Sequence, residues 1–100
     1  MIKIKINYND SFIKDFKVSG HANYDEYGKD IVCASVSSIV ITSVNLVLKL
    51  NDKALLVKQA EGLIDVKVLI EDDTINKVLL NMKDMLEELS KDYKKHVKII

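Results

Sequence analysis

Cys33 and His21 are the side chains in this sequence with the greatest scope for covalent chemistry. Cys33 is the sole thiol and follows Asp30 at the start of a long uncharged stretch. If Asp30 caps a helix there, Cys33 lies in the first turn, where the helix dipole and free backbone N–H groups stabilise a thiolate. A thiolate beside an imidazole is the minimal arrangement for nucleophilic catalysis by sulfur. The pair is therefore a candidate nucleophile and base.

The segment between these two residues is predicted to be a loop. Residues 20–29 show neither strand nor helix periodicity and hold two of the three glycines, Gly20 and Gly28. A loop that leaves a strand and returns to the start of a helix can bring its two ends together, which would place His21 against Cys33. A glycine near each end of the loop gives its backbone the freedom that opening and closing of the loop would need.

Other residues near the pair are candidates for supporting roles. Asn23, Tyr24 and Tyr27 are polar or aromatic and could contact a peptide. Asp30 could cap the helix or orient the histidine, and the sequence leaves these alternatives open. Ser37 falls one helical turn after the cysteine, on the same helical face.

Structural roles for the same residues also remain open. Free cysteine is among the most buried residue types, so Cys33 in an apolar helix is also typical of core packing. His21 beside a glycine is also typical of a polar loop. His96 lies among lysines and is predicted to be solvated surface.

We expect neither a metal ion nor an organic cofactor. The five residues of ligand type near the loop lack the paired CxxC or HxxxH spacing of metal sites: His21, Asp25, Glu26, Asp30 and Cys33. Three scattered glycines cannot form a phosphate loop or a dinucleotide fingerprint.

Composition limits the classes of protein to which the chain can belong. With 100 residues, 48% hydrophobic and 30% charged, it is predicted to form one domain over residues 1–100. The net charge is zero and every basic residue is lysine, which argues against direct binding to nucleic acid or anionic lipid. The chain has a single cysteine, which cannot form an internal disulfide, and no secretory leader precedes Ile2. We therefore expect the protein to be located in the cytoplasm.

Period-two patterns predict a hairpin at the start of the chain. Residues 1–8 alternate between apolar and polar, and Asn9-Asp10 provides a turn. In the second strand, one face is predicted to hold Phe12, Lys14, Phe16 and Val18, and the other Ile13, Asp15 and Lys17.

Residues 31–48 carry no charge, and their periodicity predicts a helix that is apolar nearly all round. Six of the eighteen residues are Ser, Thr or Asn, which argues against a membrane span. The sheet and one partner helix could not cover so much apolar surface, so we expect this helix also to lie at a homodimer interface.

The remaining pattern predicts two more strands and a second helix. Strands are expected over residues 53–60 and 64–70, with a turn at Glu61-Gly62. An amphipathic helix follows Asp73, and residues 97–100 are a candidate for a short final strand. The order β-β-α-β-β-α predicts an α+β domain in two layers, with a mainly antiparallel sheet packed against two helices.

The loop and helix start carry a recognisable signature. Gly20-His21-Ala22, followed by the stretch from Gly28-Lys29-Asp30 through Cys33 to Ser37, resembles the ribosomal-processing cysteine protease family, Prp. The resemblance covers essentially the whole chain, and its most specific part is the spacing of glycine, histidine, aspartate and cysteine.

The resemblance implies a function. Members of the family are homodimeric bacterial proteases that remove a short N-terminal extension from large-subunit ribosomal protein twenty-seven. The family's nucleophile falls on Cys33 and its histidine on His21, with Asp30 and Ser37 at other motif positions. Backbone N–H groups at the helix start would be candidate oxyanion donors. The alternative is a non-catalytic dimeric module that binds a ribosomal protein or assembly factor, with Cys33 as packing.

Overall fold

The computed structural model describes residues 1–26 and 28–100, and within them the chain forms five strands and two helices. In chain order these are β1 (Ile2–Asn9), β2 (Phe12–Ser19), α1 (Ile31–Leu50), β3 (Leu55–Ala60), β4 (Leu63–Val68), α2 (Asp73–Asp92) and β5 (Val97–Ile99). The predicted α+β class is confirmed.

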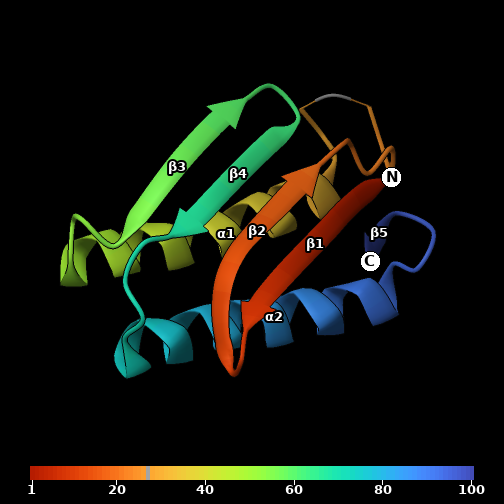
Figure 1. Ribbon diagram of the computed structural model, residues 1–100. Helices are drawn as coiled ribbons and strands as arrows, with labels where there is room; N and C mark the ends of the chain where they lie inside the picture. Colours follow the sequence, from red (N-terminus) through yellow and green to blue (C-terminus); the bar gives the residue numbers. More distant parts are fainter. Residues whose placement is uncertain (27) are drawn as a thin grey trace.

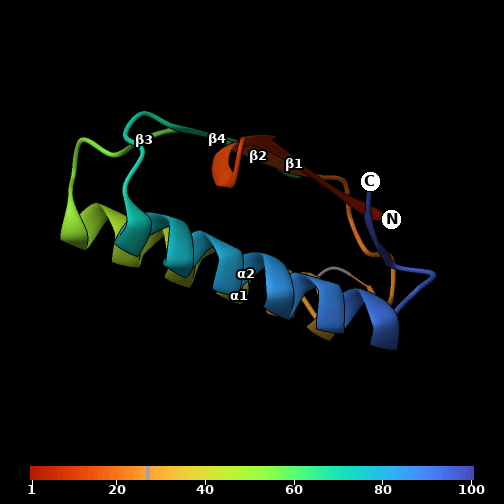
Figure 2. The same cartoon turned by 60° about the horizontal axis from the view of Figure 1, so that its bottom comes forward.

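The strands form one sheet in the order β3-β4-β2-β1-β5. Its pairs are antiparallel except that β5 lies parallel to β1. Figures 1 and 2 show α1 and α2 side by side against the same face of the sheet, which gives the predicted two layers. Apolar side chains of both layers fill the space between them, among them Ile4, Phe16, Val36, Val66 and Leu79.

The predicted alternation is wrong in the first half of β2. A register shift lies between Asn7 and Tyr8 of β1, so that Tyr8 pairs with Ile13 while Asn7 pairs with Asp15. The extra residue on β2 is Lys14, and a bulge of this kind reverses the inward and outward alternation on one side of it. Ile13 is therefore buried where Phe12 was expected.

The later strands are shorter than predicted. β3 begins at Leu55 because residues 52–54 form a turn after α1, and β4 ends at Val68. Just beyond it, Leu69 N–H donates to the Ala54 carbonyl at 2.7 Å. The candidate final strand is present as β5, and it extends the sheet beyond β1.

The first helix has an apolar surface that the rest of the chain covers only in part. Its valines face the core, at positions 32, 36, 40, 44 and 47. Ile31, Ile41, Leu46 and Leu50 remain 40–55% exposed. By length and composition α1 also meets the criteria for a membrane span, as the core helices of water-soluble proteins can. Its buried valines pack it against the sheet and α2.

Candidate active site

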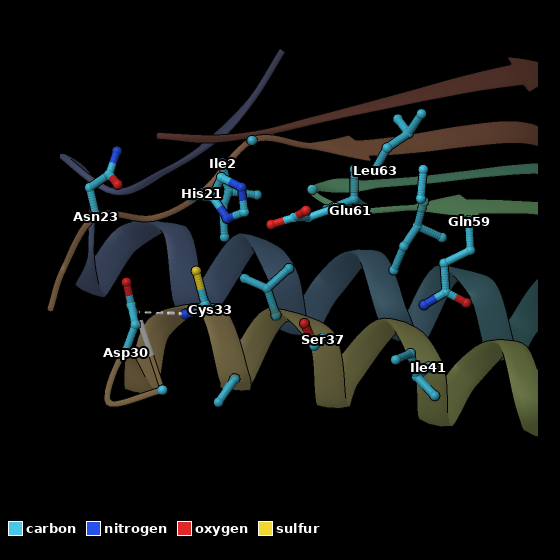
Figure 3. A pocket seen from close by; sticks show the side chains of 18 of the residues that line it. Ile2, His21, Asn23, Asp30, Cys33, Ser37, Ile41, Gln59, Glu61 and Leu63 are labelled. Carbon is cyan, nitrogen blue, oxygen red and sulfur yellow. Dashed lines mark hydrogen bonds between the residues drawn. The ribbon is translucent and has the colours of Figure 1, made fainter. Parts of the chain in front are cut away.

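A pocket of about 620 Å³ lies where the segment after β2, the first turns of α1 and the turn between β3 and β4 meet. Figure 3 shows His21 and Glu61 above the pocket, with Cys33, Ser37 and Ile41 below them on α1. The structure therefore brings the predicted nucleophile and base into one cleft.

Cys33 is the third residue of α1, as the sequence predicted from Asp30. Its side chain is half-buried, and the sulfur accepts a hydrogen bond from Ala22 N–H at 3.2 Å. Figure 3 shows the sulfur pointing up from the helix toward the ring of His21. The sulfur therefore lies at the N-terminus of α1 with one backbone N–H donor beside it.

Asp30 is the N-cap of α1 and also anchors the loop. One carboxylate oxygen accepts from Val32 and Cys33 N–H, each at 3.0 Å. The other accepts from Tyr24 and Asp25 N–H, at 3.0 and 3.4 Å. Burial raises the pKa of Asp30, but these backbone hydrogen bonds outweigh it and hold the pKa below its ordinary value. The carboxylate thus joins the loop to the helix start.

Asp30→Ala is expected to lower the free energy of unfolding by about 1–2 kcal/mol at neutral pH, since the cap and the loop anchor are both lost. Because the folded-state pKa is lowered, this contribution is present above the ordinary aspartate range and is lost as pH falls through the folded pKa. The parent and the variant should therefore converge in acid when urea unfolding is followed across pH. Asp52→Ala, in the exposed turn after α1, is the control, and an equal loss there would contradict the prediction.

The turn between β3 and β4 supports the imidazole of His21. Gly20 N–H donates to the Gly62 carbonyl at 2.9 Å, which ties the base of the loop to this turn. Gly62 has φ +67°, and a Cβ added there would lie 3.0 Å from His21 Nε2. Glycine at this position therefore leaves the space that the ring occupies.

Gly62→Ala should displace the His21 ring, and if His21 is the base that the sequence predicts, kcat should fall by about 10- to 100-fold, because a misplaced base transfers a proton less effectively. The proton NMR signals of the two imidazoles offer a direct check. The His21 signals are expected to shift, and the signals of an unfolding-insensitive reference compound added to the sample fix the scale. Unchanged His21 signals with full activity would contradict the prediction.

Some predicted site residues line the pocket and others do not. Gly20, Asn23, Gly28 and Ser37 line it. Tyr24 is not among the residues that line it; its ring packs edge-on against Tyr93 and His96 and remains 45% exposed. Tyr27 lies outside the described residues.

The prediction that His96 is solvated surface is wrong. The imidazole is half-buried, and its Nδ1 lies 2.9 Å from the carbonyl oxygen of Ala22, 74 positions earlier in the chain. Tyr24 contacts it edge-on at 5.2 Å between ring centroids. The flanking lysines gave no signal of this contact, because it depends on how α2 and β5 pack beside the loop.

The expected oxyanion donors are also occupied. Val32 and Cys33 N–H both donate to the Asp30 carboxylate, and Ala34 N–H donates to the Asp30 carbonyl. Among residues 1–26 and 28–100, no three His, Cys, Asp or Glu side chains form a group suited to a metal ion.

The fold and the pocket define a small α+β protein in which a thiol at a helix N-terminus shares one cleft with an imidazole, as in cysteine-dependent hydrolases. A family model described as Cysteine protease Prp matches residues 1–98. The chain therefore belongs to the Prp family of cysteine proteases.

Relatives in the family match part of the sequence. The protein named Ribosomal processing cysteine protease Prp from Staphylococcus aureus is 41% identical over 54 residues, which cover 53% of this chain and 51% of that protein. The protein of the same name from Bacillus subtilis is 45% identical over 42 residues, covering 42% and 38%. In these matches the chain spans about half the length of the curated relatives, or less.

Solved structures match over nearly the whole chain. The S. aureus Prp protease with a covalently linked product peptide superposes with a TM-score of 0.94 at 27% identity, covering 99% of this chain and 97% of that one. The same protease with a substrate peptide gives a TM-score of 0.88 at 26% identity, covering 100% and 98%.

Proposed function

We propose that this protein is a cysteine endopeptidase that uses Cys33 and His21 to cut a peptide bond. The observation that carries the proposal is the sulfur of Cys33 at the start of α1, with the His21 ring above it in the same pocket. Membership of the Prp family supports the same activity.

The chemistry follows from these two groups. The Cys33 thiolate attacks the scissile carbonyl carbon, and the amine leaves with a proton from the His21 imidazolium. The resulting thioester is then attacked by water, with His21 taking a proton from that water. The carboxylic acid product leaves and the thiolate is restored.

We propose that the substrate is the N-terminal extension of large-subunit ribosomal protein twenty-seven, cut in the bacterial cytoplasm during ribosome assembly. The pocket lining supports binding of a peptide that is largely apolar and also carries a positively charged residue. It offers apolar side chains, among them Ile2 and Ile41, beside the carboxylates of Asp25, Asp30 and Glu61. The names of the S. aureus and B. subtilis relatives describe ribosomal processing, which supports the same substrate class.

The test is to incubate the protein with the extended ribosomal precursor and map the new N-terminus by mass spectrometry. We expect one cleavage within the extension and none in the mature ribosomal protein used as control. Stable binding without cleavage would overturn the protease proposal in favour of a non-catalytic binding module.

We also propose that a second copy of the chain covers the exposed apolar side of α1. Ile31, Leu46 and Leu50 of this helix are 45–55% exposed, and large contiguous apolar patches on a protein surface often mark interfaces with a partner. We expect light scattering to give the mass of a dimer and Leu46→Glu to lower it to a monomer. A monomer mass for the parent across micromolar concentrations would overturn this part of the proposal.

A further inference from the structure

Ala22, the residue after His21, is held by hydrogen bonds on both sides of its backbone. Its N–H donates to Cys33 Sγ at 3.2 Å, and its carbonyl oxygen lies 2.9 Å from His96 Nδ1. Its side chain is buried, with 1% of its surface exposed. The backbone beside the catalytic histidine is thus fixed between the nucleophile and an imidazole from the far end of the chain.

The imidazole of His96 is itself held in place. His96 N–H donates to the Tyr93 carbonyl at 2.9 Å, and its own carbonyl accepts from Ile2 N–H at 2.8 Å. Tyr24 packs edge-on against both His96 and Tyr93, with centroids 5.2 and 5.5 Å away. In Figures 1 and 2 the segment after α2 lies close to the loop that follows β2.

We propose that His96 is a positioning residue for the Cys33–His21 pair, acting through the Ala22 carbonyl. This inference rests on the proposed protease function. With the proton on Nδ1, His96 donates to this carbonyl and holds the backbone whose N–H faces the sulfur. Loss of the donor leaves the buried end of the loop with an unpaired carbonyl and frees His21 to move from its place above Cys33.

Two substitutions separate the hydrogen bond from the ring contact. In His96→Asn, the side-chain amide can place a donor near the position of Nδ1 but lacks the ring. In His96→Phe, the ring against Tyr24 is kept and the donor is lost. Lys95→Ala, at the exposed neighbouring position, is the matched control.

We expect His96→Phe to lower kcat on the precursor by about tenfold or more, with a smaller change in KM, since a positioning defect acts on the reacting geometry. His96→Asn should recover most of the loss, and Lys95→Ala should match the parent. The rate at which iodoacetamide alkylates Cys33 should follow the same order, and thermal unfolding should show that every variant is folded at the assay temperature.

Full kcat and full alkylation rate in His96→Phe would overturn the proposal. Equal losses in His96→Asn and His96→Phe would also overturn it, because a restored donor would then fail to rescue the positioning of the loop. The alkylation rates keep this test separate from the protease proposal. If the parent does not cleave the precursor, the proposed function fails, but the order of alkylation rates still shows whether His96 positions the loop against Cys33.

Discussion

Cys33→Ala is expected to lower kcat on the ribosomal precursor by about 10⁴-fold or more, as removal of a covalent nucleophile does in other proteases. The physical reason is that no other thiol is present in the sequence to attack the carbonyl carbon and form the thioester. The measurement is a single-turnover cleavage assay read by mass spectrometry, with circular dichroism to show that the variant is folded.

Ser35→Ala provides a control in the same turn of α1. The Ser35 hydroxyl donates to the Ile31 carbonyl within the helix, and its loss should leave kcat unchanged. Cys33→Ser keeps a side chain of similar shape but a much weaker nucleophile, so it should also be nearly inactive. If Cys33→Ala cleaves the precursor as fast as the parent, Cys33 is not the nucleophile.

Gly20→Ala is expected to lower the free energy of unfolding by about 3 kcal/mol, which is near the upper end for a single substitution. Gly20 has φ +92°, and a Cβ there would collide with the carbonyl oxygen of Met1. This oxygen cannot move aside easily, because Ile2 pairs with β5 and donates to the His96 carbonyl. Urea unfolding of the parent and the variant measures the difference.

Gly28→Ala is the control that separates two effects of Gly20→Ala, the collision of the new Cβ with Met1 and the strain of a positive φ. Gly28 has φ +87°, but a Cβ there would meet nothing within 4 Å. Its replacement should therefore cost only the strain of a left-handed conformation, about 1 kcal/mol. Equal losses of stability in the two variants would show that contact with Met1 does not contribute.

The elements that depend on local pattern could be predicted from the sequence. Asp30 beside an uncharged periodic stretch was enough to predict that α1 begins at Ile31, because capping acts within one turn. The apolar stripe of α2 also packs as predicted, with Ile75, Leu79 and Met82 buried. Cys33 at a helix start and His21 at the far end of the loop followed from the same local signals.

The features that were missed depend on contacts between distant parts of the chain. The alternation in β2 reverses at a bulge that its composition does not mark, since Lys14 is an ordinary residue for an exposed strand. His96 stands among lysines, and its role depends on a loop 74 residues away. The close contact between Gly62 and the His21 ring requires the β3–β4 turn to reach the end of β2, which only the strand order reveals.

The parallel pairing of β5 with β1 has a consequence for the timing of folding during translation. β1 is synthesised before the other strands of the sheet, but the edge of β1 that faces β5 stays unpaired until Val97, Lys98 and Ile99 have been made. Contacts between residues so far apart in sequence form late, because a long loop must close first. The segment that pairs with this edge follows directly after His96. The nascent chain can therefore build the cleft early, but the cleft reaches its final geometry only after these residues have left the ribosome.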